Sequence, residues 1–427
     1  MTKPSLLERR YAVLGKHSPL FYDEPLHIVR GEGVWVYDVD GNRYLDVYNN
    51  VPHVGHCHPC VVEALSKQAA TLNTHTRYLH ENIVRYAERI VATFDASLSM
   101  MMLACTGSEA NEIAIRMARA HTGGLGLICS SDTYHGNTAS VFELGTIFNP
   151  ETFSPAENVR TVPPPDSYRA LHGLEGEALA NAYAAEVQRA IDSFTHAGIK
   201  LAAALFCPAF TNEGLINAPQ GFMDKAIKKV RAAGGLYIAD EVQAGFGRTG
   251  HHWWAHQWDT VVPDIVTLGK PIGNGHPMSA VVARADLIEE FGARGMYFNT
   301  FGGNPVSCAV GNAVLDVLEN ENLMQNAINV GNYVLTGLEK LKDKHDVIGD
   351  VRNKGMFFAV DMVKNRATKE HAGDEAKRLV EFMLKNKILI SRIGRNGSVL
   401  KMRPPMPFTT EHADLLLATL AEAFQSL

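Results

Sequence analysis

The chain has 427 residues, of which 46% are hydrophobic and 20% are charged, which is typical of a globular protein with two or three domains and a large buried core. Its formal net charge is -6 and no basic stripe stands out, so we expect neither a nucleic-acid partner nor binding to a membrane surface. No segment approaches the ~20 apolar residues of a membrane span, the N-terminus lacks the pattern of a signal peptide, and the six cysteines follow no disulfide framework, which predicts a cytoplasmic protein with reduced thiols.

In chain order, the first predicted element is a β-hairpin. Residues 32–50 alternate between apolar and polar, and Asp40–Gly41 is a turn signal inside this segment. From about residue 60, segments of helical period alternate with short apolar runs. Helices are expected in 59–72, 80–94, 108–124, 220–235, 304–320 and 326–345, and buried strands in 124–131, 201–210, 234–241 and 264–270. This alternation predicts an α/β domain with a mostly parallel sheet.

The C-terminal part changes in character. Residues 355–363 and 388–409 have the composition of strands, with helices between and after them, which predicts a smaller α+β domain. The boundary falls near residues 305–330, inside a helix and without a flexible linker. We therefore expect an N-terminal segment, 1–55, that contributes to the small domain, a large domain in 56–315 and the small domain itself in 316–427.

Two charged residues follow predicted strands of the large domain. Asp240 ends the apolar run 236–239, where a buried carboxylate is costly unless a cation or a set of donors meets it. Lys270 lies two residues beyond the strand expected to end at Leu268. Ligands of open α/β sheets bind outside the carboxyl ends of the strands, so both residues are candidates for a binding site.

A third strand end, in "ACTGSEANE", opens a helix. Thr106, with Glu109 three residues later, fits a capping box. Gly107 and Ser108 then present backbone N–H groups at the positive end of the helix, where phosphate is the usual ligand. A lysine that can form an imine with an aldehyde, a carboxylate that can keep a ring nitrogen protonated and a phosphate cradle together point to pyridoxal phosphate.

Two other motifs match known patterns only in part. The glycines of "GFGRTG", residues 245–250, match the dinucleotide pattern, but the residues after them are a poor start for a helix. The segment "HVGHCHPC", residues 53–60, resembles a metal cluster, but a structural zinc site needs a second, distant pair of ligands. We therefore expect no metal.

Several motifs together are highly specific. They are "GNRYLDVYNNVPHVGHCHP", "TGSEANEIAIRMAR", "YHGNT", "LYIADEVQAGFGRTG", "VTLGKPIGNGHPMSAV", "NTFGGNPVSCAVG" and "KMRPP". On these motifs the chain resembles the class III (subgroup II) pyridoxal-phosphate aminotransferases, from about Pro25 to the C-terminus. The resemblance implies fold type I, with a large cofactor-binding domain and a smaller α+β domain.

The resemblance also implies roles for individual residues. Lys270 should hold the cofactor covalently and then move the substrate's proton. Asp240 should pair with the ring nitrogen and Gln243 should bond the phenolic oxygen. Tyr134, in "YHG", should stack on the ring face.

Further roles concern the cofactor's phosphate. Gly107 and Ser108 should bind it, and Thr300, in "NTFGGNP", should bind the phosphate of the neighbouring subunit's cofactor. This last role implies a homodimer with shared sites, alone or paired into a dimer of dimers. Glu241, next to Asp240, is expected to be structural.

Two departures from the family pattern concern the substrate. Members that use an ω-amino acid usually carry a Glu-Pro after the strand at 201–206, and here Cys207 stands in the place of that Glu. The typical late Arg-x-x-Pro-Pro is replaced by "KMRPP", with Lys401 at the arginine's position and Arg403 two residues later. Several segments resemble the branch of phospho-lyases, which eliminate phosphate from ethanolamine phosphate or phosphorylated hydroxylysine.

We therefore expect a phospho-lyase that converts ethanolamine phosphate to acetaldehyde, ammonia and phosphate. The leaving phosphate needs positive charge, and the candidates are Arg77, His53, Lys401 and Arg403. An ω-amine or alanine–glyoxylate type aminotransferase is the alternative. A third hypothesis is a non-enzymatic protein on the same fold. The joint presence of four cofactor residues argues against it, and these are Lys270, Asp240, Gln243 and Tyr134.

Overall fold

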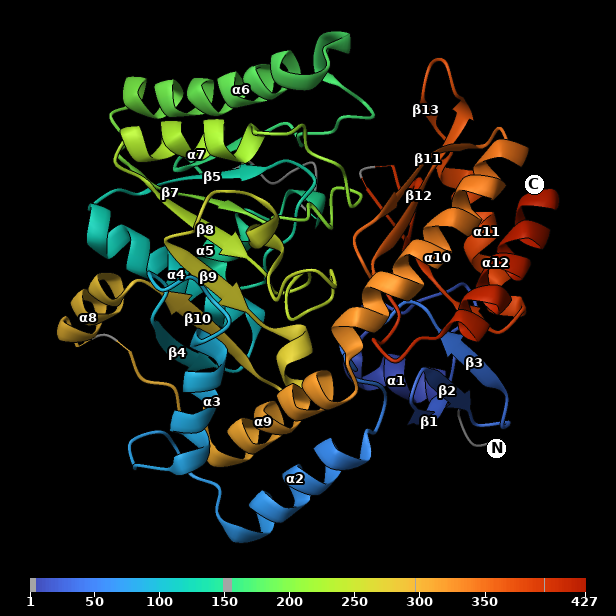
Figure 1. Ribbon diagram of the computed structural model, residues 1–427, viewed down its shortest axis with the longest axis horizontal. Coiled ribbons are helices and arrows are strands. Elements are labelled where there is room, and N and C mark those ends of the chain that lie inside the picture. Colours follow the sequence, from blue (N-terminus) through green and yellow to red (C-terminus); the bar gives the residue numbers. More distant parts are fainter. Residues whose placement is uncertain (1–4, 149–155, 296, 395) are drawn as a thin grey trace.

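A central sheet organises the larger part of the molecule in the computed structural model, which describes residues 5–148, 156–295, 297–394 and 396–427 (Figure 1). Within these residues the strand order is β4-β10-β9-β8-β7-β5-β6. The strands are β4 (Met100–Ala104), β5 (Gly126–Ser130), β6 (Val159–Val162), β7 (Leu201–Phe206), β8 (Leu236–Asp240), β9 (Ile265–Leu268) and β10 (Ser279–Ala283). Strands β6, β5, β7, β8 and β9 run parallel, and β10 is antiparallel to both of its neighbours, so the mostly parallel sheet is confirmed.

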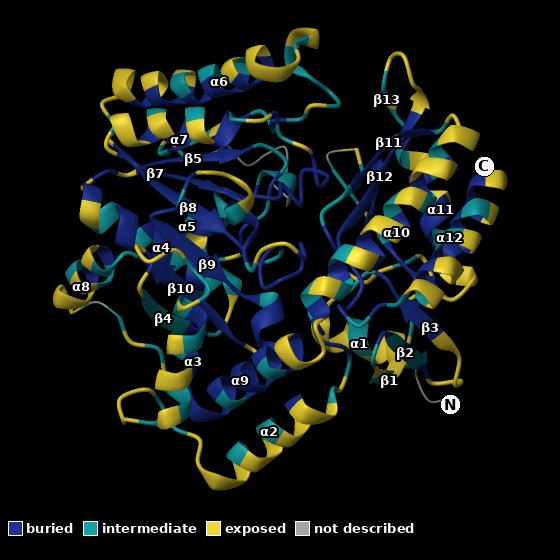
Figure 2. Cartoon of the chain, in the orientation of Figure 1, coloured by how far each residue is buried: buried dark blue, intermediate teal, exposed yellow. Residues whose placement is uncertain are grey.

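Helices cover both faces of this sheet. One face packs on α4 (Gly107–Thr122) and α8 (Ala285–Ala293), the other on α6 (Gly176–His196) and α7 (Phe222–Ala232). Along β5, Leu127 and Cys129 face the α4 side while Ile128 faces the α6 side. Because both faces are buried, β5, β7, β8 and β9 are apolar runs, and this is why the sequence predicted these four strands (Figure 2). The strands β6 and β10 were not predicted.

The helix α4 begins as the sequence predicted. The Thr106 hydroxyl accepts from the backbone of Glu109, whose carboxylate accepts from the backbone of Thr106, and Gly123 ends the helix in a left-handed conformation. Helix α6 was not predicted, although Leu179, Tyr183 and Val187 recur on one buried face.

The smaller part of the molecule is built from both ends of the chain (Figure 1). The strands β1 (Ile28–Glu32), β2 (Trp35–Asp38) and β3 (Arg43–Asp46) form a sheet with the late strand β14 (Ile388–Leu389). The predicted hairpin is confirmed by β2 and β3, in which Trp35 pairs with Leu45. Leu45 also pairs in parallel with Ile388, so strands from opposite ends of the chain lie side by side.

A second sheet completes this part. Its strands are β11 (Ile348–Asn353), β12 (Phe358–Asn365), β13 (Glu370–His371), β15 (Ser391–Ile393) and β16 (Val399–Met402), and its helices are α10 (Leu323–Lys344), α11 (Gly373–Lys385) and α12 (Thr410–Gln425). Only Glu321 and Asn322 separate α10 from α9 (Pro305–Asn320), on which α2 (Pro59–Thr71) and α3 (Glu81–Val91) pack. The remaining helical segments are α1 (Leu6–Leu14), α5 (Ala139–Phe142) and the 3-10 turns Thr146–Phe148, Leu171–Gly173, Ala255–Trp258 and Lys270–Gly273. Across the described ranges we find no helix with both the length and the apolar character of a membrane span.

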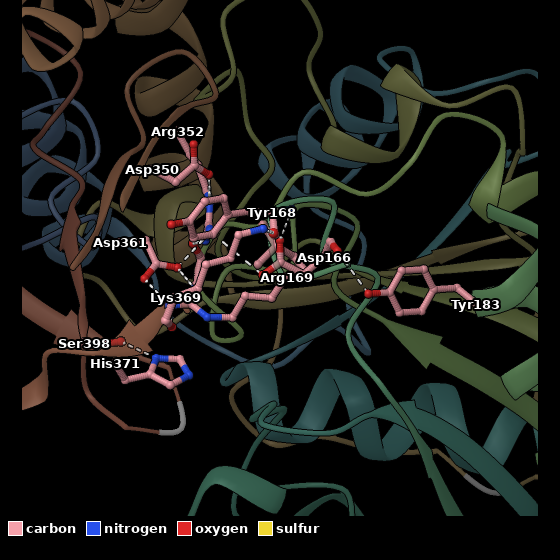
Figure 3. Close-up of polar contacts among 12 residues, drawn as sticks. Asp166, Tyr168, Arg169, Tyr183, Asp350, Arg352, Asp361, Lys369, His371 and Ser398 are labelled. Carbon is pink, nitrogen blue, oxygen red and sulfur yellow. Dashed lines mark hydrogen bonds and ion pairs between the residues drawn. The ribbon is translucent and has the colours of Figure 1, made fainter. Parts of the chain in front are cut away.

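A buried ion cluster joins the two parts (Figure 3). Asp361 on β12 accepts from both terminal nitrogens of Arg169, which precedes α6, and from Arg352 Nη2 at 2.9 Å. Arg352 in turn donates to Asp350 at 2.8 Å and to the carbonyl of Gly214 at 2.9 Å. Asp361 and Arg352 are each 1% exposed, so this cluster lies away from water.

We expect Asp361→Ala to lower the free energy of unfolding by about 3 kcal/mol, since it leaves two arginines without their shared carboxylate. Denaturant unfolding of the cofactor-free protein measures the change. Glu370→Ala is the control, because its ion pair with Lys364 is exposed and is worth less than about 1 kcal/mol. Equal effects of the two substitutions would contradict a stabilising role of the cluster.

Candidate active site

The carboxylate of Asp240 lies at the end of the central strand β8 and is 5% exposed. Its Oδ2 accepts from His135 Nδ1 at 2.6 Å and from Asn111 Nδ2 at 3.1 Å, and its Oδ1 accepts from the backbone of Val242 at 3.0 Å. Burial alone would raise the pKa of Asp240, but the bond and the charge of His135, together with the other donors, hold it below its usual value. Asp240 is therefore an anion fixed in place.

Lys270 follows β9, at the start of a short 3-10 turn. Burial lowers the pKa of its amine, and Arg403 lowers it too, while Asp240 acts in the opposite direction. A lowered pKa makes the neutral amine more available, which both attack on an aldehyde and proton abstraction require.

Glycines make room between these residues and the start of α4. A Cβ on Gly107 would lie 2.9 Å from Val242 Cγ1, and one on Gly269 would lie 3.0 Å from the same atom. Val242 thus packs between the helix N-terminus and Lys270. Gly136, at φ +149, passes so close to Ser108 that a Cβ would lie 2.6 Å from its hydroxyl oxygen. The backbone around the helix end therefore tolerates no side chain at these points.

One cleft unites most of the predicted cofactor residues. Of the predicted set, it is lined by Gly107, Ser108, Tyr134, Asp240, Gln243 and Lys270. His135, Cys207, Thr211 and Asn212 line it as well. The strand ends named in the sequence analysis thus meet in space, as the rule for open α/β sheets requires.

Gln243 is held by its neighbours in this cleft. Its Nε2 donates to Asn212 Oδ1 at 3.0 Å, and its Oε1 accepts from Lys401 Nζ at 3.3 Å. Lys401 comes from β16, in the smaller part of the molecule, and is 1% exposed. Burial drives the pKa of Lys401 well below its usual value, and the nearby charges of Arg403 and Lys270 act in the same direction.

Arg403 adds a further buried positive charge. Its guanidinium lies over the ring of Tyr48 at 4.5 Å, and its Nε is buried without a partner among the described residues. Burial lowers its pKa, while Tyr48 and Asp46 raise it. Lys270, Lys401 and Arg403 thus lie close enough for their charges to influence one another.

The structure argues against the predicted phosphate-binding role of His53. The side chain is fully buried, its Nε2 bonds the carbonyl of Phe246 at 2.7 Å, and its Nδ1 faces Arg248 Nη2 at 3.1 Å. Both ring nitrogens are engaged, and burial keeps the pKa of His53 well below its usual value. The reason is a contact between distant segments, because the "VPHVGH" segment folds inward against the loop after β8.

Two other predicted residues lie away from the cleft within one chain. Arg77 is exposed between α2 and α3, with its guanidinium 3.8 Å from the centre of the Phe298 ring. Thr300 is exposed on the segment before α9. Neither lines the cleft around Lys270. Glu241, expected to be structural, accepts from the backbone and ring of His256 at 2.7 and 2.8 Å.

Sequence reasoning missed three polar residues that contact Asp240 or line the cleft. His135 is the residue next to Tyr134 in "YHG", and its adjacency to a predicted cofactor contact was the available signal. Asn111 interrupts the apolar face of α4, which marks it as a buried polar group that needs partners. Asn212 lies in the irregular segment after β7, where no periodicity gives a signal.

The family assignment follows from comparison with known proteins. The family model described as "Aminotransferase class-III" matches residues 21–424. The chain belongs to the class III aminotransferase family. The resemblance stated from the motifs is thereby confirmed, and with it fold type I.

Relatives of two kinds match nearly the whole chain. The "Alanine--glyoxylate aminotransferase 2-like" protein of Drosophila melanogaster is 39% identical, over 100% of this chain and 88% of that protein. The "Ethanolamine-phosphate phospho-lyase homolog 1" of Caenorhabditis elegans is 37% identical, over 95% and 90%. Among solved structures, a phospholyase from Arthrobacter in complex with phosphoethanolamine has a TM-score of 0.95 and 46% identity, covering 99% of this chain and 100% of that one.

A more distant class III structure is the (S)-enantioselective omega-transaminase of Thermomicrobium roseum. It is 27% identical, with a TM-score of 0.88 and coverage of 100% and 99%. The cofactor of the family is pyridoxal phosphate, which confirms the cofactor prediction for this chain.

The residues of the cleft fit this cofactor. Gly107 and Ser108 line the cleft at the start of α4, where the backbone N–H groups of a helix N-terminus suit a phosphate. Asp240, buried and ionised, suits a ring N–H, and Lys270 suits an aldehyde. When bound, pyridoxal phosphate supplies an aldehyde that captures an amine and a ring that accepts electrons from the adjacent carbon.

Proposed function

We propose that this class III enzyme is a phospho-lyase, which eliminates phosphate from a phosphorylated amino alcohol such as ethanolamine phosphate. The observation that carries the proposal is the buried amino group of Lys401, in direct contact with two side chains of the cleft wall. In the aminotransferases that the chain resembles, this position holds an arginine that binds the carboxylate of the substrate. Ethanolamine phosphate has no carboxylate and does have a phosphate.

Among the comparisons, the solved structures support this proposal. The chain is 46% identical to the Arthrobacter phospholyase and 27% identical to the Thermomicrobium transaminase, at nearly complete coverage of both. Cys207 also lines the cleft where the ω-amino-acid enzymes carry a glutamate. Burial raises the pKa of this thiol to about 12, so Cys207 adds no charge that would hold an arginine.

The chain's own residues account for the steps. Lys270, as a neutral amine, removes the proton from the carbon that bears the substrate nitrogen and holds it. Phosphate then leaves from the next carbon, while the charges of Lys401 and Arg403 offset the charge that develops on it. The two-carbon enamine that remains takes up one water, so that ethanolamine phosphate and water yield acetaldehyde, ammonia and phosphate.

We propose a homodimer in which each chain completes the other's site. Arg77 and Thr300 lie on exposed segments. The apolar side chains of these segments are exposed to solvent in a single chain, and they are Tyr78, Leu79, Phe298 and Phe301. Leu79 is 100% exposed, which suits a surface that a second copy buries. On this proposal Thr300 reaches the partner's cofactor phosphate and Arg77 the partner's substrate phosphate. The compartment we propose is the cytoplasm, in keeping with six unpaired cysteines.

The holoenzyme is expected to release inorganic phosphate from ethanolamine phosphate over many turnovers when no keto acid is present. Phosphate, ammonia and acetaldehyde should appear in equal amounts, because each elimination yields one of each. Phosphate and aldehyde assays measure this stoichiometry, with ethanolamine as the matched substrate that lacks the leaving group. Absence of phosphate release from ethanolamine phosphate and from other phosphorylated amino alcohols would rule the proposal out.

An aminotransferase is the second candidate, because the Drosophila relative at 39% identity carries an aminotransferase name. It predicts that an amine donor alone converts the bound cofactor to its amine form, seen as loss of the cofactor's absorbance, and that pyruvate or glyoxylate restores it. The phospho-lyase needs no keto acid, so the same absorbance experiment distinguishes the two candidates.

A further inference from the structure

Two of the six cysteines differ from the others, because both are exposed and lie close together in the sequence. Cys57 and Cys60 are free thiols on the surface, whereas three of the other cysteines are buried. His58 and Pro59 alone lie between the pair. Two cysteines with this spacing can form a disulfide where the chain turns, since the bond joins residues whose Cα atoms are about 4.4–6.8 Å apart. The pair thus has the spacing and the accessibility of a C-x-x-C redox dithiol.

The pair lies at the N-terminal end of α2. His58 is the N-cap residue, Pro59 opens the helix and Cys60 follows in the first turn. Cys57 precedes the cap with a φ of 52°, a left-handed conformation that is uncommon for a residue other than glycine. The backbone therefore bends at Cys57 as it enters the helix. The side chain of His58 makes no capping hydrogen bond, so the first N–H groups of α2 remain available to a sulfur anion.

The histidines of this segment have other partners, which leaves the two thiols without further metal ligands. His56 Nε2 lies 2.7 Å from Asp46 Oδ2, and both ring nitrogens of His53 are engaged, as described above. Across the described ranges no three side chains of His, Cys, Asp or Glu are grouped so that they could hold a metal ion. The C-x-x-C is therefore available for thiol chemistry.

His58 can take up the proton that a reacting thiol loses. Its Nε2 lies 3.0 Å from Oε1 of Glu321, an acceptor, so Nε2 is the nitrogen that carries the proton of the neutral ring. The other ring nitrogen, Nδ1, is buried and has no hydrogen-bond partner among the described residues. An unpartnered acceptor thus lies in the residue between the two cysteines, and a thiol has to lose its proton before it can attack a disulfide.

The residues before Cys57 hold the turn that begins at Lys270. Asn274 ends this turn. The backbone N–H of Val54 donates to Asn274 Oδ1 at 2.9 Å, and Asn274 Nδ2 donates to the carbonyl of Gly55 at 3.0 Å. Gly55 lies two positions before Cys57 in the sequence. A change of the backbone at Cys57 therefore acts, through one amide side chain, on the turn that carries Lys270.

We propose that Cys57 and Cys60 are a redox-sensitive pair, which small disulfides such as oxidised glutathione convert to a disulfide, and that this oxidation lowers the turnover of the enzyme. One cysteine sulfur first bonds to a sulfur of oxidised glutathione, whose S–S bond breaks and releases one glutathione. The second cysteine then attacks the bound sulfur of the first, the Cys57–Cys60 bond forms and the second glutathione leaves. The protein loses two hydrogens, which the two released glutathione molecules carry.

The effect on turnover follows from the position of the new bond. The disulfide ties Cys57 to the first turn of α2, changes the bend at Cys57 and weakens the hold of Val54 and Gly55 on Asn274. In a reducing compartment the pair rests as thiols, and glutathione reverses the oxidation. The inference concerns the turn that carries Lys270, so it holds for a lyase and for an aminotransferase alike.

The test is incubation of the holoenzyme at set ratios of reduced to oxidised glutathione, followed by trapping of free thiols and peptide mass mapping. We expect one intramolecular disulfide, between Cys57 and Cys60, that forms and reverses with the ratio. Turnover, measured as phosphate release or as amine transfer, should fall by about fivefold on oxidation, as for loss of one supporting hydrogen bond. Mapping of the disulfide needs no activity, so its result does not depend on the proposed reaction.

Three variants separate the pair from other thiols. Cys57→Ser and Cys60→Ser should keep the turnover of the reduced protein and lose the response to oxidised glutathione. Cys105→Ser is the matched control, because Cys105 is the remaining thiol that is not buried, and the response should persist in this variant. A response that disappears in Cys105→Ser would place the sensitive thiol elsewhere and overturn the proposal.

A fourth variant tests the link to Lys270. Asn274→Ala should lower the turnover of the reduced protein, and oxidation should then cause little further loss, because the contact that it weakens is already absent. Cys57 and Cys60 that stay as thiols, or as mixed disulfides with glutathione, at the most oxidising ratio would overturn the proposed pair. A mapped Cys57–Cys60 disulfide with unchanged turnover would overturn the proposed effect on the enzyme.

Discussion

Lys270→Ala is expected to lower the rate of phosphate release by about 10⁴-fold, which is the upper range for loss of a general base. No other amine is placed to replace it among the described residues. Asp240 is an anion held by three donors, and Lys401, whose amine bonds Asn212 and Gln243, is not among the residues that line the cleft. Stopped assays of phosphate release measure the loss.

The same variant should also bind pyridoxal phosphate reversibly. Lys270 is the expected covalent attachment, so dialysis should remove the cofactor from Lys270→Ala and not from the parent protein. Borohydride reduction of the parent, followed by peptide mapping, should place the cofactor on the peptide that contains Lys270. A cofactor found on another lysine, or unchanged turnover in Lys270→Ala, would contradict the assignment of this residue.

Replacing Lys401 with methionine is expected to lower phosphate release by about 100-fold, as for loss of one group that stabilises developing charge. It should at the same time raise the free energy of unfolding of the cofactor-free protein by about 2 kcal/mol, because an apolar side chain of similar size replaces a buried amine. Both effects follow from the surroundings of Lys401. The residue is 1% exposed, and its amine donates to the amide oxygens of Asn212 and Gln243.

The lowered pKa of Lys401 predicts how the stability gain and the binding of phosphate change with pH. The pKa of Lys401 is lowered in the folded state, so the unfolded chain binds its proton more readily, and the stability gain in Lys401→Met should shrink as the pH rises toward about 10.4. A phosphate bound nearby raises that pKa again. Binding of inorganic phosphate should therefore take up a proton and weaken with rising pH, with a smaller slope in Lys401→Met. Titration calorimetry in two buffers measures this uptake.

A matched control is available in Lys354. Burial lowers its pKa to about 8, and it lines a separate cavity with Asp259 and Trp258. Lys354→Met removes a comparable amine and should leave phosphate release unchanged. If Lys354→Met and Lys401→Met reduced phosphate release equally, the position of Lys401 beside the cleft would have no special part in the reaction.

Much of the part built on the seven-stranded sheet could be predicted from the sequence because its signals are local. Burial on both faces makes β7 and β8 uninterrupted apolar runs, and the Thr106–Glu109 capping box fixes where α4 begins. Asp240 and Lys270 follow from the same logic, since Asp240 ends β8 and Lys270 follows β9, and these two strands run parallel to each other. The motifs around them were specific enough to give the family and the cofactor.

The missed features depend on contacts between distant segments. No local pattern shows that His53 turns its two ring nitrogens toward Phe246 and Arg248, 193 and 195 positions away. The Asp361 cluster likewise joins Arg169 across 192 positions. Arg77 looked like a cleft residue because its type suits phosphate, but within one chain its guanidinium lies over the ring of Phe298, and neither residue lines the cleft.

The pairing of β3 with β14 constrains how the protein can be made. Tyr44 and Lys387, which touch across this junction, are 343 positions apart. At about 5–20 residues per second, the ribosome needs roughly 20–70 s between them, and the early hairpin has to wait for its partner strand during that time. The segment carrying Lys401 emerges later still, so the nascent chain can complete its sheet of parallel strands well before the wall of the cofactor site exists.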